Sequence, residues 1–299
     1  MADRTLMFTD DQATPARVEM LLDLARSMQS RKFDSSTIQQ LLQPTGLPGL
    51  TKGSNQYRIV LNAAKELDLV KEQDDAMIRP TRQRDSRSAH RAVLDAIDDK
   101  VLRSDEVEPW FALFYAFLLG RDEMAALGPA AGTHWENRFE RELFGGTRQN
   151  NRFNESKYRG LRRWFRYSGL GWHDGEECFH PNPYQRLERQ LPAIFNKVRD
   201  LSIDLFMDRL SELCPELDGG HIFLRANRDW DVSARTVSLG LSHALVDLHL
   251  DGAIELNCPL DSDGWSIAKA APPYDGKNLK SDRVASVRMR SAGGARTNG

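Results

Sequence analysis

The sequence predicts a mainly helical α+β protein with small β-hairpins, built from tandem winged helix-turn-helix units. Its 299 residues are 40% apolar and 28% charged, which is the composition of a folded protein. Stretches with helical spacing of apolar residues alternate with short strand-like segments. The helix-to-hairpin junction LDLV, residues 67–70, recurs as SGLG, residues 168–171, and as DGAI, residues 251–254. We therefore expect units over residues 1–88, 89–183 and 184–271, followed by a disordered basic tail over residues 272–299.

Three helices and a hairpin are predicted in the first unit. Residues 15–28 place four apolar side chains on one helical face, after Thr14 as a suitable N-cap. A short helix, TIQQLL, ends before Pro44, and a third helix with an apolar face begins after Ser54. The strand-like segments LVKEQ and AMIRP then form the hairpin.

The second and third units show the same order of elements. Helices over residues 106–119 and 133–144 precede a basic helix and the hairpin LGWHDGEECFHP. In the third unit, helices over residues 201–214 and 234–250 precede a hairpin within AIELNCPLDSDGWSIAK. This order is typical of a winged helix-turn-helix domain, in which the third helix faces DNA.

The basic helix of the second unit lies in ESKYRGLRRWFRYSGLGWHDG, residues 155–175. At helical spacing its arginines share one face and its aromatic residues the other, so the arginines form a single positive patch. Such a patch favours contact with DNA phosphates, although a solvated face or an acidic protein partner are alternatives. The predicted DNA contacts of this unit are Arg148, Arg152, Asn154, Lys157, Arg159, Arg162, Arg163 and Arg166.

The third helix of the first unit is a weaker candidate for DNA contact. Its outward residues include asparagine and arginine, which can bind base edges, but an ordinary polar face explains them equally well. The predicted contacts here are Asn55, Arg58, Asn62 and Lys65, with Arg79 on the hairpin.

The third unit differs from the others in charge. Residues 200–275 carry 5 Lys and Arg against 14 Asp and Glu, whereas residues 138–199 carry 13 against 7. An acidic surface repels phosphate, so this unit is expected to bind protein. Leu239 and Val246 form a second apolar pair on its last helix, which predicts either a partner-binding surface or burial against another part of this chain.

Other functions find little support in the sequence. It has no apolar run long enough for a membrane span and no secretory signal, and its three scattered cysteines suit a reducing cytoplasm. The cluster HDGEECFH lacks the second Cys/His pair that a structural zinc site needs. We find no catalytic motif and expect no cofactor, no metal and no enzymatic activity, with a nuclease built from dispersed acids as an alternative.

Several short motifs resemble a known family. The segments are PELDGG, residues 215–220, the following SLGLSHALVDLHLDGAIEL, and the earlier RRWFRYSGLGW with HPNP after it. Together they resemble DpdG, a family of the bacterial gene clusters that insert 7-deazaguanine derivatives into DNA and restrict unmodified DNA. The resemblance implies a cytoplasmic, non-catalytic accessory protein that works with helicase-like and nuclease-like members of the cluster.

These observations give one functional hypothesis and two alternatives. The first is a DNA-binding adaptor in a bacterial modification or defence system, with double-stranded DNA and protein components of the complex as partners. The second is a protein–protein assembly module that uses winged helices without DNA. The third, a transcriptional regulator, would require a dimer and a palindromic site.

Overall fold

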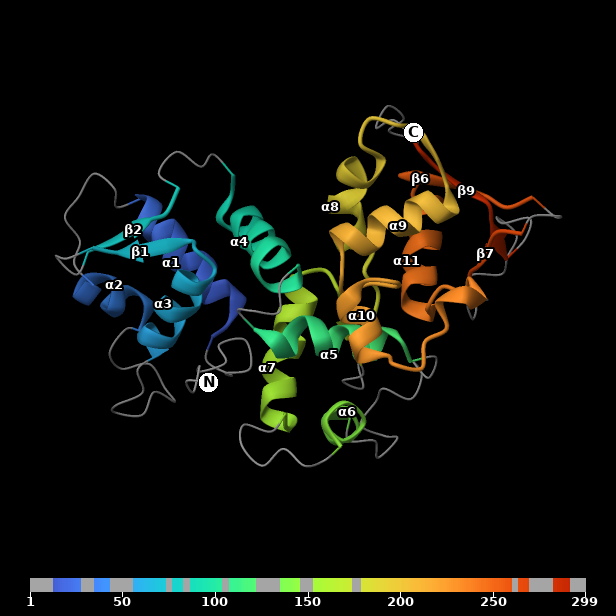
Figure 1. Ribbon diagram of the computed structural model, residues 1–299. Coiled ribbons are helices and arrows are strands. Elements are labelled where there is room, and N and C mark those ends of the chain that lie inside the picture. Colours follow the sequence, from blue (N-terminus) through green and yellow to red (C-terminus); the bar gives the residue numbers. More distant parts are fainter. Residues whose placement is uncertain are drawn as a thin grey trace. The chain divides into compact units, whose positions relative to one another are not determined.

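The computed structural model describes eleven segments of the chain. They are residues 13–27, 35–43, 56–73, 77–82, 87–103, 108–121, 135–145, 153–173, 179–259, 263–268 and 282–290. The described chain is mainly helical with small antiparallel sheets, which confirms the predicted α+β class at this level (Figure 1).

The chain divides into two compact units, not the three that the sequence predicts. The N-terminal unit contains residues 1–111 and 148–167, and the C-terminal unit contains residues 112–147 and 168–299. Both units are discontinuous in sequence, so the predicted boundaries near residues 88 and 183 do not separate them. We describe each unit by itself.

The N-terminal unit is built around α1. Its elements are α1 (Pro15–Ser27), α2 (Ser35–Leu42), α3 (Gln56–Glu66), β1 (Val70–Glu72), β2 (Ile78–Pro80), α4 (Ala89–Ile97), a π-helical turn (Asp98–Leu102) and α7 (Glu155–Tyr167). The predicted apolar face of α1 is buried, and this helix contacts α2, α3, α4 and α7. The predicted apolar face of α3 is buried as well.

The basic helix α7 joins this unit through its aromatic side. The indole N–H of Trp164 donates to the Ala13 carbonyl, 2.7 Å away, just before α1 begins. The Tyr167 hydroxyl donates to the Glu19 carboxylate on α1, and burial together with this bond raises the pKa of Tyr167 well above its ordinary value. The Phe165 ring meets Phe111 edge to face at 4.9 Å between centroids. These contacts fix α7 against α1, which sequence spacing could not show.

The C-terminal unit surrounds a very apolar helix. Its elements are α5 (Pro109–Leu119, from Ala112 onward), α6 (Trp135–Phe144), β3 (Gly171–His173), β4 (Phe179–Pro181), α8 (Tyr184–Phe195), β5 (Asp200–Ser202), α9 (Ile203–Leu213), α10 (His221–Ala226), a 3-10 turn (Val232–Ala234), α11 (Leu239–Leu250), β6 (Ile254–Asn257), β7 (Trp265–Ser266), β8 (Arg283–Val284) and β9 (Ser286–Met289). Every α5 side chain from Ala112 to Leu119 is buried, which explains why this helix has no polar face.

The repeated junction has a residue with a positive φ angle in all three places. Asp68, Gly169 and Gly252 adopt positive φ angles of 55°, 69° and 76°. After α3 and α11, the residue that follows the left-handed residue donates a backbone hydrogen bond to the end of the helix. Leu69 N donates to the Ala64 carbonyl at 2.9 Å, and Ala253 N donates to the Leu248 carbonyl at 3.0 Å. This bond is typical of a helix that ends at a left-handed residue. The sequence repeat therefore corresponds to a structural repeat.

Gly252 offers a direct test of that geometry. A Cβ added there would meet no atom within 4 Å, so replacing Gly252 with alanine adds backbone strain without a clash. We expect Gly252→Ala to lower the free energy of unfolding by about 1–2 kcal/mol, measured by urea denaturation. Gly252→Asn is the matched control, and its free energy of unfolding should fall by less than that of the alanine variant, because asparagine tolerates the left-handed region. Equal stability of wild type and the alanine variant would contradict this interpretation.

The first two hairpins share their register. Val70 pairs with Pro80 in the first hairpin, and Gly171 pairs with Pro181 in the second. Each residue of the second pair lies 101 residues after the equivalent residue of the first pair. In both, the residue after the proline donates to the residue before the first strand, from Thr81 to Leu69 and from Asn182 to Leu170, each at 2.9 Å. The two predicted hairpins are thus confirmed as antiparallel pairs.

The third hairpin differs from the prediction. β6 pairs with β9, in the register Ile254 to Met289, and not with the segment that contains β7. β7 pairs with β8 instead, while β9 is the central strand of the sheet β5-β9-β6. Residues 282–290 are therefore ordered, and the predicted disordered tail is wrong for them. Val284 and Val287 are fully buried, but the basic and small residues around them hide this pattern in the sequence.

The PELDGG segment is a buried polar turn between α9 and α10. Glu216 accepts from Arg186 on α8, with 2.9 Å between Oε1 and Nε, and both side chains are fully buried. The Asp218 carboxylate accepts from the Ser238 backbone N–H at 2.6 Å and from its hydroxyl at 2.7 Å. Ser238 is the N-cap of α11, so this turn links α8, α9 and α11.

Candidate nucleic-acid interface

The predicted DNA-contacting helix α7 begins at a side-chain cap. The Asn154 side-chain oxygen accepts from the Lys157 backbone N–H at 3.1 Å, which satisfies one of the first donors of the helix. The caps and the aromatic face explain why this segment is helical: Leu161, Trp164 and Phe165 are buried in the N-terminal unit. The opposite face is left to the arginines.

The arginines of α7 lie together on its outer face, as the sequence predicts. Arg159, Arg163 and Arg166 are exposed and Arg162 is half-buried. The Arg162 guanidinium lies 5.5 Å from the centre of the Tyr158 ring, one turn earlier. A row of guanidinium groups on one helix can bind successive phosphates of a nucleic-acid backbone.

An acidic side chain lies beside this patch. Glu155 Oε1 lies 3.9 Å from Arg159 Nε, and the two side chains are 70% and 54% exposed. Exposed pairs of this kind contribute about 1 kcal/mol at most, so a phosphate can compete for Arg159. The patch therefore keeps its positive character.

Other predicted residues of the second unit have different surroundings. Lys157 is half-buried, with its ammonium group 5.8 Å from the centre of the Trp110 ring. Asn154 is used as the cap of α7. Arg148 and Arg152 lie outside the described residues, as does Asn55 of the first unit.

The outward face of α3 carries the remaining predicted contacts. Arg58, Asn62 and Lys65 are exposed there. Lys65 Nζ forms an ion pair with Glu72 Oε2 at 3.1 Å, which reduces its value as a phosphate ligand. Arg79 on β2 is half-buried and lies opposite Lys71 on β1. Since α3 and α7 both contact α1, the two candidate helices belong to one compact unit.

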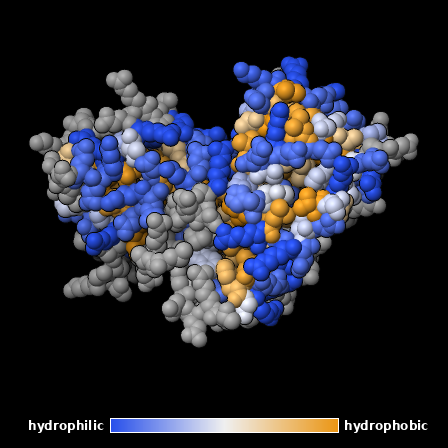
Figure 2. All heavy atoms as spheres, viewed as in Figure 1, coloured by the Kyte–Doolittle hydropathy of each residue, from blue (hydrophilic) through white to orange (hydrophobic). Residues whose placement is uncertain are grey.

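On the face shown in Figure 2, the described surface around α1, α3 and the β1–β2 hairpin is mainly hydrophilic. This agrees with a surface that meets water or a charged ligand in the free protein.

The apolar pair predicted to bind a partner does not form an exposed surface. Val246 is 8% exposed and Leu239 is half-buried, both within the C-terminal unit. A Cβ on the neighbouring Gly240 would lie 2.5 Å from Leu119 Cδ1 and 2.9 Å from the Pro181 carbonyl oxygen. α11 therefore packs against α5 and the end of the β3–β4 hairpin. The two apolar side chains thus fit the alternative interpretation, in which they are buried against another part of this chain and do not bind a partner.

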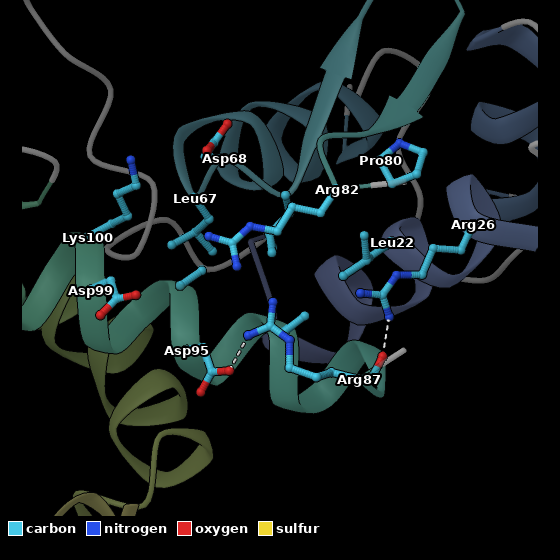
Figure 3. Close-up of a pocket in the computed structure, with 13 residues that line it drawn as sticks. Leu22, Arg26, Leu67, Asp68, Pro80, Arg82, Arg87, Asp95, Asp99 and Lys100 are labelled. Carbon is cyan, nitrogen blue, oxygen red and sulfur yellow. Dashed lines mark hydrogen bonds and ion pairs between the residues drawn. The ribbon is translucent and has the colours of Figure 1, made fainter. Parts of the chain in front are cut away.

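A small cavity, which the sequence did not predict, lies in the N-terminal unit between α1, α4 and the base of the β1–β2 hairpin (Figure 3). Its volume is about 60 Å³. Arg26 Nη1 donates to the Arg87 carbonyl at 2.7 Å, and Arg87 forms an ion pair with Asp95 on α4. Arg82 and Lys100 line the same space as Asp68 and Asp99, so cationic and acidic side chains are mixed around the cavity.

Two further features concern the described residues only. No group of three or more His, Cys, Asp or Glu side chains among them could hold a metal ion. Part of the HDGEECFH cluster, residues 174–178, lies outside the described segments. No helix within these segments has the length and apolar character needed to cross a membrane.

Comparison with known protein families gives a match. The model of a protein family described as DpdG-like matches residues 5–262. No curated protein matches the chain, and neither does any solved structure. The matched range includes both candidate helices and the PELDGG turn.

Proposed function

The chain belongs to the DpdG-like family, and we propose that it is a non-catalytic adaptor that binds double-stranded DNA in the 7-deazaguanine DNA-modification system. Membership of the family supports the association with this system. The adaptor role rests on the charges and surfaces of the chain itself.

The arginine face of α7 is the observation that carries the proposal. Three exposed arginines and one half-buried arginine project from a helix whose other side is fixed in the core of the N-terminal unit. Such an arrangement fixes the backbone positions from which the charges project, so only the arginine side chains have to become ordered when a ligand binds. Phosphate contacts of this kind bind DNA without selecting a sequence.

We interpret the three helix-to-hairpin repeats as winged helix-turn-helix elements. In each, a helix (α3, α7 or α11) ends at a left-handed residue and is followed by an antiparallel strand pair. The helix before the wing is the one that enters a DNA groove in this class of domain. This interpretation assigns DNA contact to α7 first and to α3 second.

The acidic C-terminal unit is proposed to bind a helicase-like or nuclease-like protein of the same system, in the cytoplasm. Among the described residues of the range 200–275, eight acidic side chains are exposed, namely Asp200, Asp204, Asp208, Glu212, Asp229, Asp231, Asp251 and Asp263. Their potential repels phosphate and favours a basic protein surface. The N-terminal unit would then bind DNA and the C-terminal unit a protein.

A salt titration tests the DNA-binding role. The variant Arg159→Ala/Arg163→Ala/Arg166→Ala removes the three exposed arginines of α7. We expect the slope of log affinity against log salt for a labelled mixed-sequence duplex to decrease by about three, because each lost phosphate contact decreases it by about one. Fluorescence anisotropy of the duplex at several salt concentrations measures both slopes.

The matched control removes three exposed cations from the C-terminal unit, Lys197, Arg199 and Arg225, and should keep the wild-type slope. If both variants lose affinity equally, net charge and not the α7 face is responsible. If the wild type does not bind the duplex at low salt, the DNA-binding proposal is wrong and the assembly module takes its place.

A further inference from the structure

The β3–β4 hairpin carries an exposed aromatic side chain that the duplex-binding proposal does not use. We propose that Trp172, stacked on His180, is a platform for an unpaired base of single-stranded DNA. The inference rests on the proposed function, which it extends from duplex DNA to a DNA segment that contains unpaired nucleotides.

Trp172 is held in a defined orientation. It lies directly opposite His180 in the antiparallel pair. The two rings are 4.1 Å apart between centroids and within 14° of parallel. An indole fixed in this way loses little conformational freedom when a base stacks on it.

The exposure of Trp172 is unusual for this residue type. Its side chain is 52% exposed, whereas Trp110 and Trp164 are 2% and 1% exposed. The other tryptophans with described side chains, Trp230 and Trp265, are half-buried. A large apolar ring left in water loses the free energy that burial would give, and such rings are enriched at binding surfaces.

The opposite face of the hairpin is fixed to the unit. Phe179 is fully buried, and its ring lies 5.1 Å from that of His173. A Cβ on Gly171 would lie 2.3 Å from the His180 carbonyl oxygen, so the two strands approach closely at this point. Trp172 thus projects from a closely paired strand pair whose other face carries the buried Phe179.

The corresponding position of the first hairpin has a different chemistry. The shared register aligns the pair Trp172 and His180 with Lys71 and Arg79. Two cations at the first hairpin favour phosphate, whereas two stacked aromatic rings at the second favour the flat face of a base. The two hairpins therefore suit different parts of a nucleic acid.

The preference for unpaired bases follows from stacking. In a duplex the faces of each base are covered by its neighbours, so an indole can stack only on a base that has left the helix or on a single strand. Binding of a single strand also needs positive groups that contact its backbone, and the proposed function assigns these groups to the N-terminal unit.

The test compares single-stranded and duplex DNA. Fluorescein-labelled dT20 and a labelled duplex of the same length are titrated with wild type and with Trp172→Ala, and anisotropy is recorded. We expect Trp172→Ala to weaken dT20 binding about 5- to 150-fold, which corresponds to about 1–3 kcal/mol for one stacked base. Duplex binding should change by about twofold or less.

Two control variants separate stacking from other effects. Trp172→Phe keeps an aromatic ring and should restore most of the affinity for dT20. Lys71→Ala changes the corresponding residue of the first hairpin and should leave the ratio of single-strand to duplex affinity unchanged. Because Trp172 is exposed, thermal unfolding should show all these variants to be as stable as wild type.

The possible results separate this inference from the proposed function. If Trp172→Ala binds dT20 as tightly as wild type while the α7 arginine variant loses affinity, the stacking platform is wrong and the adaptor proposal stands. If neither DNA is bound by wild type, both are wrong, and Trp172 then belongs to a protein contact. Equal losses for dT20 and duplex would also overturn the preference for unpaired bases.

Discussion

Glu216→Gln is expected to lower the free energy of unfolding by about 3–5 kcal/mol. The Glu216 and Arg186 side chains are both fully buried and lie 2.9 Å apart. A second guanidinium nitrogen, Nη2 of Arg186, donates to the Leu213 carbonyl at 3.2 Å. Glutamine keeps the size of the side chain but leaves the Arg186 charge buried without its carboxylate, and burying a charge alone is costly.

Urea denaturation of the wild type and the variant measures this loss. Glu212→Gln is the matched control, because Glu212 lies on α9 four residues earlier and is exposed. It should change stability by about 0.5 kcal/mol or less. The double variant Arg186→Met/Glu216→Leu should recover most of the loss, since an apolar pair of similar volume removes both charges. A change below about 1 kcal/mol for Glu216→Gln would contradict the importance of the charge pair.

Asp218 is expected to make the stability of the protein depend on pH in the opposite direction from an ordinary surface carboxylate. Burial raises its pKa from 3.8 to about 6, even though the two hydrogen bonds from Ser238 act to lower it. The folded state then holds the proton more tightly than the unfolded state. Binding of this proton therefore stabilises the folded state. This contribution to the free energy of unfolding is fully present below about pH 4 and is lost as the pH rises through about 6.

The difference in stability between Asp218→Asn and wild type isolates this effect. Between pH 4 and pH 7 the free energy of unfolding of the variant should rise by about 3 kcal/mol relative to that of wild type, because each unit of pKa difference corresponds to about 1.4 kcal/mol. Asparagine can keep both contacts with Ser238, accepting from its N–H and donating to its hydroxyl. Urea denaturation at four pH values measures the difference, and Asp229→Asn, an exposed position, is the control. A difference that does not change with pH would mean that Asp218 titrates normally.

Much of the helical structure could be predicted from the sequence. The buried faces of α1 and α3 and the aromatic face of α7 are those given by helical spacing, because this periodicity depends only on residues three or four apart. The first two hairpins were predictable for a similar reason, since only five residues of sequence separate the two strands of each. The arginine face of the candidate site follows directly from the same spacing.

The strand partners of the third repeat were beyond such prediction. β6 pairs with β9, which lies about thirty residues later, while the nearer β7 pairs with β8. Strand pairing at this distance depends on which edges meet in the folded chain and not on the local pattern. The tail was therefore mistaken for disorder, because its composition is rich in glycine, serine and basic residues.

The buried charges illustrate the same limit. Glu216 and Asp218 look in the sequence like members of an acidic surface, and Arg186 like one of many cations. Only the fold removes these three side chains from water and joins α8, α9 and α11 through them. The PELDGG motif thus has a structural role that charge counting could not give.

The sequence alone determined the helix faces, the three repeated junctions, the charge of each region and the resemblance to the DpdG family, because these are properties of neighbouring residues. The tertiary structure decided that α7 packs against α1, that β9 completes the last sheet, and that Trp172 is exposed while Val246 is buried. Those features depend on contacts between residues far apart in the chain, and local periodicity carries no information about them.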